Sequence, residues 1–258
     1  MRLFHICTLV TNMEQYRAMK ESFIAGGFSE ERCRYTILDN RGENRYEGFG
    51  GFNTAQADTQ EPYLIYCHQD LILPPGDGYG RLLGIMEEMD RTDPRWAVLG
   101  NAGWADLTHV ALAISDPVWV NRRLGNLPQR VQSLDENFLV VKTASGLRCS
   151  PELSGYHMYA TDLCLVASQR GYHCYVIDFL LTHLSQGNKS RDFYEVRRRF
   201  VHRWSREFAF RFVRTPSTIL FLSRYRPLRL LLDSRLVRYV VSRPITIRLL
   251  SRLFPLPS

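Results

Sequence analysis

The sequence predicts an α/β protein with a Rossmann-like fold, in which a mainly parallel sheet is covered by helices on both faces. Two observations lead to this prediction. Apolar strand-like runs alternate with segments of helical periodicity through the first hundred residues, which is typical of βαβ units. Three of the four runs end in small or polar side chains, at Thr11-Asn12, Asp39-Asn40 and Gly100-Asn101, and ligands of such sheets bind beyond the carboxyl ends of the strands.

Each element follows from a local signal. The segment 13–27 has apolar residues at helical spacing and closes on Gly26-Gly27, a suitable helix end. Another helix stops at Asp93-Pro94, because the residue before a proline disfavours the helical conformation. The expected elements are strands over 3–10, 34–40, 63–73 and 96–103, with helices over 13–27, 53–60 and 78–94.

The second half of the chain divides into three parts. Residues 105–155 lose the regular pattern and are expected to form irregular strands and loops around a substrate cleft. Residues 158–187 predict a helix, a cap at Gly171, a strand and a polar turn. After Lys189 the composition changes to arginine, leucine, phenylalanine and valine. We therefore expect a first domain over residues 1–190 and a basic helical extension over residues 191–258.

Composition restricts the class of protein. With 258 residues and 45% apolar side chains, the chain can bury one sizeable core. Its six cysteines are scattered without CxxC spacing, so we expect free thiols in a reducing compartment and no zinc site. The first residues do not resemble a signal peptide, and no apolar run is long enough to span a bilayer. The expected location is the cytoplasm, including attachment to the inner face of a membrane.

The charge is concentrated at the end of the chain. Residues 197–258 hold fifteen arginines against two acids, a net charge of +13, which leaves −6 for residues 1–196. Phe200, Trp204, Phe208 and Phe212 recur every four residues, as on one face of a helix. Apolar stripes bordered by arginine suit an anionic membrane surface, although such helices also pack on their own domain. We place the membrane slightly ahead, and the apolar content argues against nucleic acid as partner.

The segment CHQDLIL carries the clearest chemical signal. A carboxylate inside or just after a buried strand, here Asp70, is costly to desolvate unless a cation or hydrogen bonds compensate it. Carboxylate oxygens suit Mg²⁺ or Mn²⁺, which commonly bridge a protein carboxylate to substrate phosphates. From this triplet alone, a metal ligand and a solvated residue after the strand are about equally favoured.

Five segments together resemble the family-2-like glycosyltransferases with a GT-A fold, nearest to the group that resembles the streptomycin-biosynthesis glycosyltransferase-like protein. The resemblance covers about residues 3–190, and the five motifs occur in the family's order. The matching segments are TLVTN (8–12), LDN with FNTAQA (38–57), YLIYCHQDLIL (63–73), VQSLDENFLVVK (131–142) and SGYHMYATDLCLVASQRGYHCYVIDFLLTHLSQG (154–187).

The resemblance implies a role for each matched residue. Asp70 would bind a Mn²⁺ or Mg²⁺ ion that holds the donor's diphosphate, and His183 would be a second metal ligand or a phosphate contact. The donor-binding residues would be Thr11, Asn12, Asp39 and Asn53, with His68 and Gln69 shaping the loop. On its own, His183 is more simply a strand-end histidine bonded to backbone, and Asp135 an ordinary turn residue.

One position departs from the family. The family reads Tyr-Asp-x-Asp, and its first aspartate aligns with the general base, whereas this chain has Ala160 there. Because alanine cannot accept a proton, we expect Asp162 to act as the base, or Asp135 to reach in from the acceptor side.

The expected activity is inverting transfer of a sugar from a nucleotide-sugar donor to an acceptor hydroxyl. The acceptor would be a glycan or lipid-linked molecule of surface-polysaccharide, lipid-linked glycan or secondary-metabolite assembly. The alternatives are an inactive sugar-nucleotide-binding homologue and a membrane- or partner-docking protein.

Overall fold

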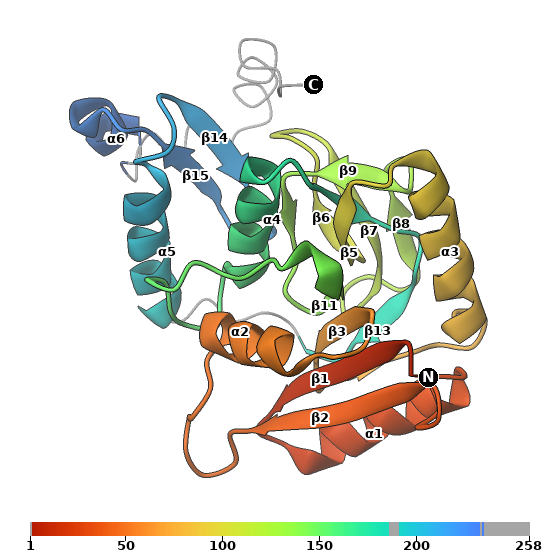
Figure 1. Ribbon diagram of the computed structural model, residues 1–258. Helices are drawn as coiled ribbons and strands as arrows, with labels where there is room; N and C mark the ends of the chain where they lie inside the picture. Colours follow the sequence, from red (N-terminus) through yellow and green to blue (C-terminus); the bar gives the residue numbers. More distant parts are fainter. Residues whose placement is uncertain (1, 186–190, 233, 235–258) are drawn as a thin grey trace.

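The computed structural model describes residues 2–185, 191–232 and 234 and confirms the α/β class (Figure 1). A seven-stranded sheet forms its centre, and five of its strands run in one direction. The two exceptions, β9 and β11, each run antiparallel to their neighbours. In spatial order the strands are β2 (Cys33–Asp39), β1 (Phe4–Val10), β3 (Tyr63–His68), β11 (Phe138–Lys142), β5 (Trp96–Gly100), β12 (His173–Val176) and β9 (Gln129–Val131).

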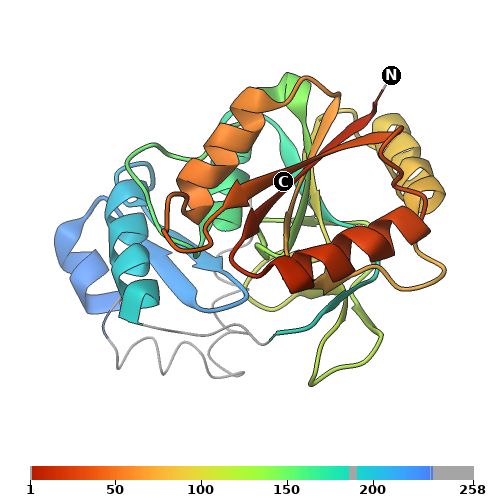
Figure 2. The same cartoon turned by 90° about the horizontal axis from the view of Figure 1, so that it is seen from below.

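Alternation along the strands separates two apolar cores. On β11, Phe138 and Val140 join one core, while Leu139 and Val141 join the other, because successive side chains of a strand point to opposite faces. The first core packs against α1 (Met13–Ala25) and α3 (Tyr79–Thr92), and the second against α2 (Gly48–Asp58) and α4 (Tyr159–Gln169). Figure 2 shows α1 and α2 on opposite faces of β1 and β2. The molecule is therefore a three-layer structure, as predicted.

A second sheet lies beyond the ends of the central strands. It is built largely from the irregular region and has the order β10-β6-β7-β13-β4, with β8 paired to β7. Its strands are β4 (Leu71–Ile72), β6 (Ala102–Trp104), β7 (Val110–Ser115), β8 (Arg122–Leu124), β10 (Ser133–Leu134) and β13 (Leu181–His183). A short 3₁₀ helix, Thr143–Ser145, follows β11.

Three expected elements have clearly different boundaries in the structure, and one of them is the strand expected over 96–103, which is divided into β5 and β6. The strand expected over 63–73 is divided into β3 and β4 by a turn at Gln69-Asp70. The helix expected over 53–60 begins earlier, at Gly48, because the carboxylate of Glu47 accepts hydrogen bonds from the N–H groups of Phe49 and Gly50 and caps it. An acidic N-cap, six residues upstream of the expected start, compensates for the glycine-rich first turn of this helix.

The described part of the arginine-rich extension packs on the body instead of standing apart. It contains α5 (Arg191–Trp204), β14 (Arg211–Arg214), β15 (Ile219–Leu222) and α6 (Arg226–Leu232). Phe200 and Trp204 are fully buried in the core that also holds α2 and α4. The predicted four-residue stripe is wrong beyond Trp204, because α5 ends there and Phe212 lies in β14. The described part of the extension thus shares a core with the body, and residues 233 and 235–258 of the predicted extension lie outside the described residues.

All six cysteines are buried free thiols, as expected. Within the described part of the chain, no helix has the length and apolar character needed to cross a membrane.

Candidate functional site

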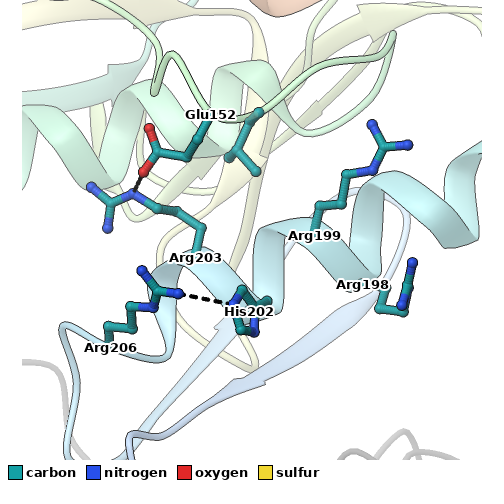
Figure 3. A pocket seen from close by; sticks show the side chains of 7 residues that line it. Glu152, Arg198, Arg199, His202, Arg203 and Arg206 are labelled. Carbon is teal, nitrogen blue, oxygen red and sulfur yellow. Dashed lines mark hydrogen bonds and ion pairs between the residues drawn. The ribbon is translucent and has the colours of Figure 1, made fainter.

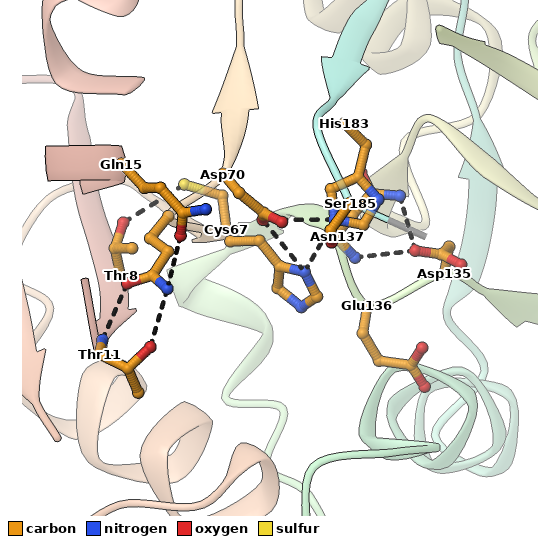
Figure 4. Close-up of polar contacts among 12 residues, drawn as sticks. Thr8, Thr11, Gln15, Cys67, Asp70, Asp135, Glu136, Asn137, His183 and Ser185 are labelled. Atoms are coloured by element: carbon orange, nitrogen blue, oxygen red, sulfur yellow. Dashed lines mark hydrogen bonds and ion pairs between the residues drawn. The ribbon is translucent and has the colours of Figure 1, made fainter. Parts of the chain in front are cut away.

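A cavity of about 730 Å³ opens where the central strands end. Its wall comes from the end of β1 with Thr11, the start of α2, the end of β3 with the β3–β4 turn, the end of β7, the segment before β11, the segment that leads into α4, the end of β13 and the β14–β15 turn. Side chains that carry chemistry line it together: His68, Gln69, Asp70, Asp116, Asp135, Glu136, His157, Tyr159 and His183. Figure 4 shows Asp70, Asp135, Glu136 and His183 among them. The sequence analysis expected ligands beyond the carboxyl ends of the strands, which is where this cavity lies.

Three of these residues form a compact cluster of metal-ligating side chains. The Nε2 atom of His183 lies 3.3 Å from Asp70 Oδ1, and the Nδ1 atom of His68 lies 4.0 Å from the same oxygen. The two imidazoles approach to 3.5 Å between His68 Nδ1 and His183 Nε2. One donor atom from each residue fits within a span of 4.8 Å, so a single cation could contact all three.

The fold explains why residues 115 positions apart meet. β13 pairs antiparallel with β4, with His183 opposite Leu71, the residue after Asp70. The N–H of Leu184 also donates a hydrogen bond to the Asp70 carbonyl oxygen at 3.0 Å. The second sheet therefore holds His183 against the β3–β4 turn through backbone pairing.

The cluster has unusual proton affinities. Burial raises the pKa of Asp70. Hydrogen bonds from His183 and Ser185 and the charge of His183 lower this pKa by a larger amount, so the net shift is downward. Burial lowers the pKa of His183, and the hydrogen bond and charge of Asp70 outweigh this and raise it overall. The pKa of His68 is lowered by burial and by the neighbouring His183. The lowered pKa values of Asp70 and His68 favour an ionised carboxylate and a neutral imidazole, which suit cation binding, whereas His183, whose pKa is raised, must release its proton before it can bind a cation.

Gln69 fixes the β3–β4 turn through hydrogen bonds made by both the oxygen and the nitrogen of its side-chain amide. Its Oε1 accepts hydrogen bonds from the backbone N–H groups of Thr11 and Asn12 at 2.8 and 2.9 Å. Its Nε2 donates to Thr11 Oγ1 and Gln15 Oε1. The Asn12 side chain caps α1 through the N–H groups of Glu14 and Gln15. Gln69 thus joins the ends of β1 and β3.

Three expected donor-binding residues lie outside the cavity wall: Asn12, whose side chain caps α1, Asp39 and Asn53. Asp39 stands at the end of β2 with a half-exposed side chain and forms a bidentate ion pair with Arg41, so it stays a predicted nucleoside contact at the same sheet edge. Asn53 instead bonds the backbone of Cys149 with both side-chain ends, at 3.0 and 2.8 Å. We correct the expectation for Asn53: it joins α2 to the loop before α4.

Asp162 does not fit the role of base that was expected of it. It is fully buried, and its oxygens accept hydrogen bonds from Ser150 N, Ser150 Oγ and Trp204 Nε1 at 2.7, 2.8 and 2.7 Å. It does not line the cavity. We therefore correct the expectation: Asp162 anchors α5 to α4 through Trp204.

Asp135, the other candidate base, does line the cavity and is accompanied by Glu136. Asn137 donates two hydrogen bonds to Asp135 Oδ1, from its backbone N–H at 3.0 Å and its side chain at 2.6 Å. Glu136 Oε1 accepts from the N–H of Met158 at the start of α4. Burial and the charge of Asp135 raise the pKa of Glu136 to about 8. The cavity thus holds a carboxylate pair besides the cluster around Asp70.

Sequence reasoning missed Glu136 and Tyr159. Tyr159 donates a hydrogen bond to the Glu136 carbonyl oxygen at 2.8 Å and lies 3.5 Å from His68 Nε2. It therefore connects the two groups of polar residues. The available signal was position, because both residues stand inside the motif segments that contain Asp135 and Ala160.

Comparison with known proteins places the chain in a family. No protein-family model matches it. It is 35% identical over 212 residues to a protein of Fuscovulum blasticum called ATP synthase subunits region ORF 6, which covers 80% of this chain and 85% of that protein. The chain belongs to the family of that ORF 6 protein. The name of the ORF 6 family states no activity, so activity has to follow from the site.

Solved structures show more distant similarity to this ORF 6 family member. A197 from STIV gives a TM-score of 0.43 at 11% identity, over 72% of this chain and 87% of that one. Mannosyltransferase PcManGT from Pyrobaculum calidifontis, in complex with GDP-Man and Mn²⁺, gives 0.48 at 10% identity, over 81% and 64%. TarS 1-349 from S. aureus, in complex with UDP-GlcNAc, gives 0.48 at 13% identity, over 78% and 66%. The chain spans less than two thirds of the last two structures, and none of these similarities carries an activity across.

Proposed function

We propose that the protein is a metal-dependent glycosyltransferase that transfers a sugar from a nucleotide-sugar donor to an acceptor hydroxyl, with inversion. The observation that carries the proposal is the His68–Asp70–His183 cluster, which faces a polar cavity at the carboxyl ends of the strands. The resemblance of five ordered segments to family-2-like glycosyltransferases, including the streptomycin-type group, supports the same activity.

The donor atoms decide which cation fits. One carboxylate oxygen and two imidazole nitrogens suit a transition-metal dication better than Mg²⁺, which prefers oxygen ligands. Of the two expected ions we therefore propose Mn²⁺, held by Asp70 and His183 with His68 as third ligand. When bound, it would supply positive charge beside the donor's diphosphate, where negative charge develops as that group leaves.

The chain's own residues supply the remaining steps. Gln69 and Thr11 hold the end of β1 against the β3–β4 turn, so the donor side of the cavity is preorganised. The acceptor oxygen forms a bond to the anomeric carbon while the bond to the diphosphate breaks, and the acceptor's proton passes to Asp135. We choose Asp135 over Glu136 because a base must be ionised, and the raised pKa of Glu136 keeps it largely protonated at neutral pH.

The test is metal-dependent binding of nucleotide diphosphates by the purified chain. Asp70→Asn should abolish the Mn²⁺-dependent part of this binding and leave the fold intact, because the amide retains the shape but loses the negative charge. Asp58→Asn is the matched control, since Asp58 is an exposed carboxylate at the end of α2 that pairs with Arg34. It should bind like the unaltered chain.

A variant Asp70→Asn that binds with unchanged Mn²⁺ dependence would contradict the proposal. The second candidate function is an inactive sugar-nucleotide-binding homologue, and Ala160 and the buried Asp162 favour it. A measurement of turnover distinguishes this candidate from an active transferase. Asp135→Asn should lower turnover by about a hundredfold or more while binding is retained. A chain that binds nucleotide sugar and never releases the nucleotide would support the inactive homologue instead.

A further inference from the structure

The helix α5 presents two chemically different faces. Its inner face is apolar and buried and includes Phe193, Phe200 and Trp204. Its outer face carries Arg198, Arg199, His202 and Arg203, and Arg206 follows just after the helix ends at Trp204. These side chains line a cavity of about 460 Å³ together with Glu152 and Leu153 (Figure 3). The apolar stripe noted in the sequence is therefore covered, and the arginines are what the helix offers to its surroundings.

Part of this basic face is already neutralised within the chain. Arg203 forms ion pairs with Glu152 and Glu207, and Arg199 lies 3.8 Å from Glu195. Arg198 and Arg206 are exposed, and the guanidinium of Arg206 contacts the His202 ring, another basic group, at 3.0 Å. The charge available to an external partner is therefore centred on Arg198 and Arg206.

The basic face continues onto α6, where apolar side chains are exposed. A groove of about 240 Å³ is lined by Arg198, Val201 and His202 of α5 and by Arg229 and Leu230 of α6. Leu230 and Leu231 are 64% and 63% exposed, and α6 buries none of its residues. We call the surface formed by Arg198, His202, Arg206, Arg229, Leu230 and Leu231 the α5–α6 surface.

The combination of charges and leucines selects one kind of partner. Arginines that face outward attract phosphate groups, whether of lipids or of nucleic acids. Exposed leucines gain nothing from a nucleic-acid backbone, but they can insert at the boundary between headgroups and acyl chains. A second copy of the same surface would bring like charges together. Only an anionic lipid surface complements both features.

We propose that the α5–α6 surface docks the protein on a membrane containing anionic phospholipids. Arg198 and Arg206 contact the headgroups, and Leu230 and Leu231 insert beside them. The turn between β14 and β15, in the same part of the chain, contributes Ser217 to the wall of the active-site cavity. Docking thus involves a segment that also borders the site. The proposal does not depend on the chemistry of that site, because it concerns attachment alone.

The experiment is co-sedimentation of the full chain with vesicles, either phosphatidylcholine alone or phosphatidylcholine and phosphatidylglycerol in equal amounts. Binding is expected only to the second kind. Each arginine near an anionic surface contributes about 1 kcal/mol, or roughly fivefold in affinity, so Arg198→Ala with Arg206→Ala should weaken binding about 25-fold. Arg17→Ala with Arg91→Ala is the matched control, because both arginines are exposed on other helices. It removes the same charge and should weaken binding much less.

A third variant tests insertion. Leu230→Ser with Leu231→Ser should weaken binding most at high salt, where screening has removed the electrostatic part. All six substituted residues are exposed or half-buried, so circular dichroism should show an unchanged fold. Absence of binding to phosphatidylglycerol vesicles would overturn the proposal. Equal loss in the two arginine pairs would also overturn it, because attraction would then follow net charge and not this surface.

Discussion

Removal of the Asp162 carboxylate separates a structural role from a catalytic one. In the fold, this carboxylate is the acceptor for two buried N–H donors, from Ser150 and from the Trp204 indole. Asp162→Ala leaves both donors without an acceptor, and each such group costs about 1–3 kcal/mol. We therefore expect the free energy of unfolding to fall by roughly 2–6 kcal/mol, a large part of the stability of an ordinary domain.

The conservative variant should cost less. Asp162→Asn keeps one acceptor oxygen and loses one acceptor, so roughly 1–3 kcal/mol is expected. Burial raises the pKa of Asp162 in spite of its hydrogen bonds, which means that the fold does not favour the charge itself. Trp204→Phe retains a ring in the core and removes only the donor. If the two side chains act through their shared bond, the double variant should cost less than the sum of the single ones.

The assay is urea unfolding followed by circular dichroism, which does not depend on the tryptophan that is replaced. Asp58→Asn serves again as the control for an exposed carboxylate. Nucleotide binding by Asp162→Asn should remain as long as the chain is folded. Unchanged stability in Asp162→Ala together with lost turnover would refute the structural role and return Asp162 to the list of bases.

Two further predictions concern the cavity wall. The pKa of Glu136 is raised to about 8 in the folded chain. The protonated Glu136 side chain therefore stabilises the fold at pH 4, and this contribution is lost as the pH rises to 8. Glu136→Gln should make the free energy of unfolding decline less between pH 5 and pH 8. An equal pH dependence in both chains would contradict the assignment. A Cβ at Gly48 would lie 2.4 Å from the Tyr159 ring and 2.9 Å from the Gly155 carbonyl oxygen, so Gly48→Ala should displace α4 from α2 and lower the thermal midpoint, whereas Gly80→Ala, at a helical glycine with open space, should not.

The sequence predicted the fold wherever a local pattern was enough. Apolar runs identified the strands and helical spacing identified the helices between them, whereas the turn that divides the strand expected over 63–73 and holds Asp70 was not predicted. Pairing between distant strands could not be derived in this way. His183 was found through the resemblance to a family, since its position opposite Leu71 depends on the register of β13 and β4.

The wrong assignments have one physical cause: a sequence shows what a side chain is and not what covers it. Asp162 was expected to face a substrate, yet Trp204, 42 positions later, supplies its partner. Asn53 was expected at the donor and instead bonds the backbone at Cys149. Glu47 was not predicted as a helix cap because the glycine-rich segment that follows it lacks the apolar residues at helical spacing that mark the start of a helix. Long-range partners of this kind are decided only by tertiary structure.

The described part of the arginine-rich extension is a structural part of the fold, whatever partner its outer face binds. Phe193, Phe200 and Trp204 are buried in the core shared with α2 and α4, and full burial of each such side chain contributes about 1.5–3 kcal/mol. Together they contribute about as much as the whole net stability of a typical domain. A chain cut before α5 would expose this core and lose the hydrogen bond that satisfies Asp162. Because the inner face keeps α5 in place, the charged residues of its outer face are not needed to hold the helix on the domain. This division explains how α5 can pack against the α/β body with one face and expose arginines to solvent with the other.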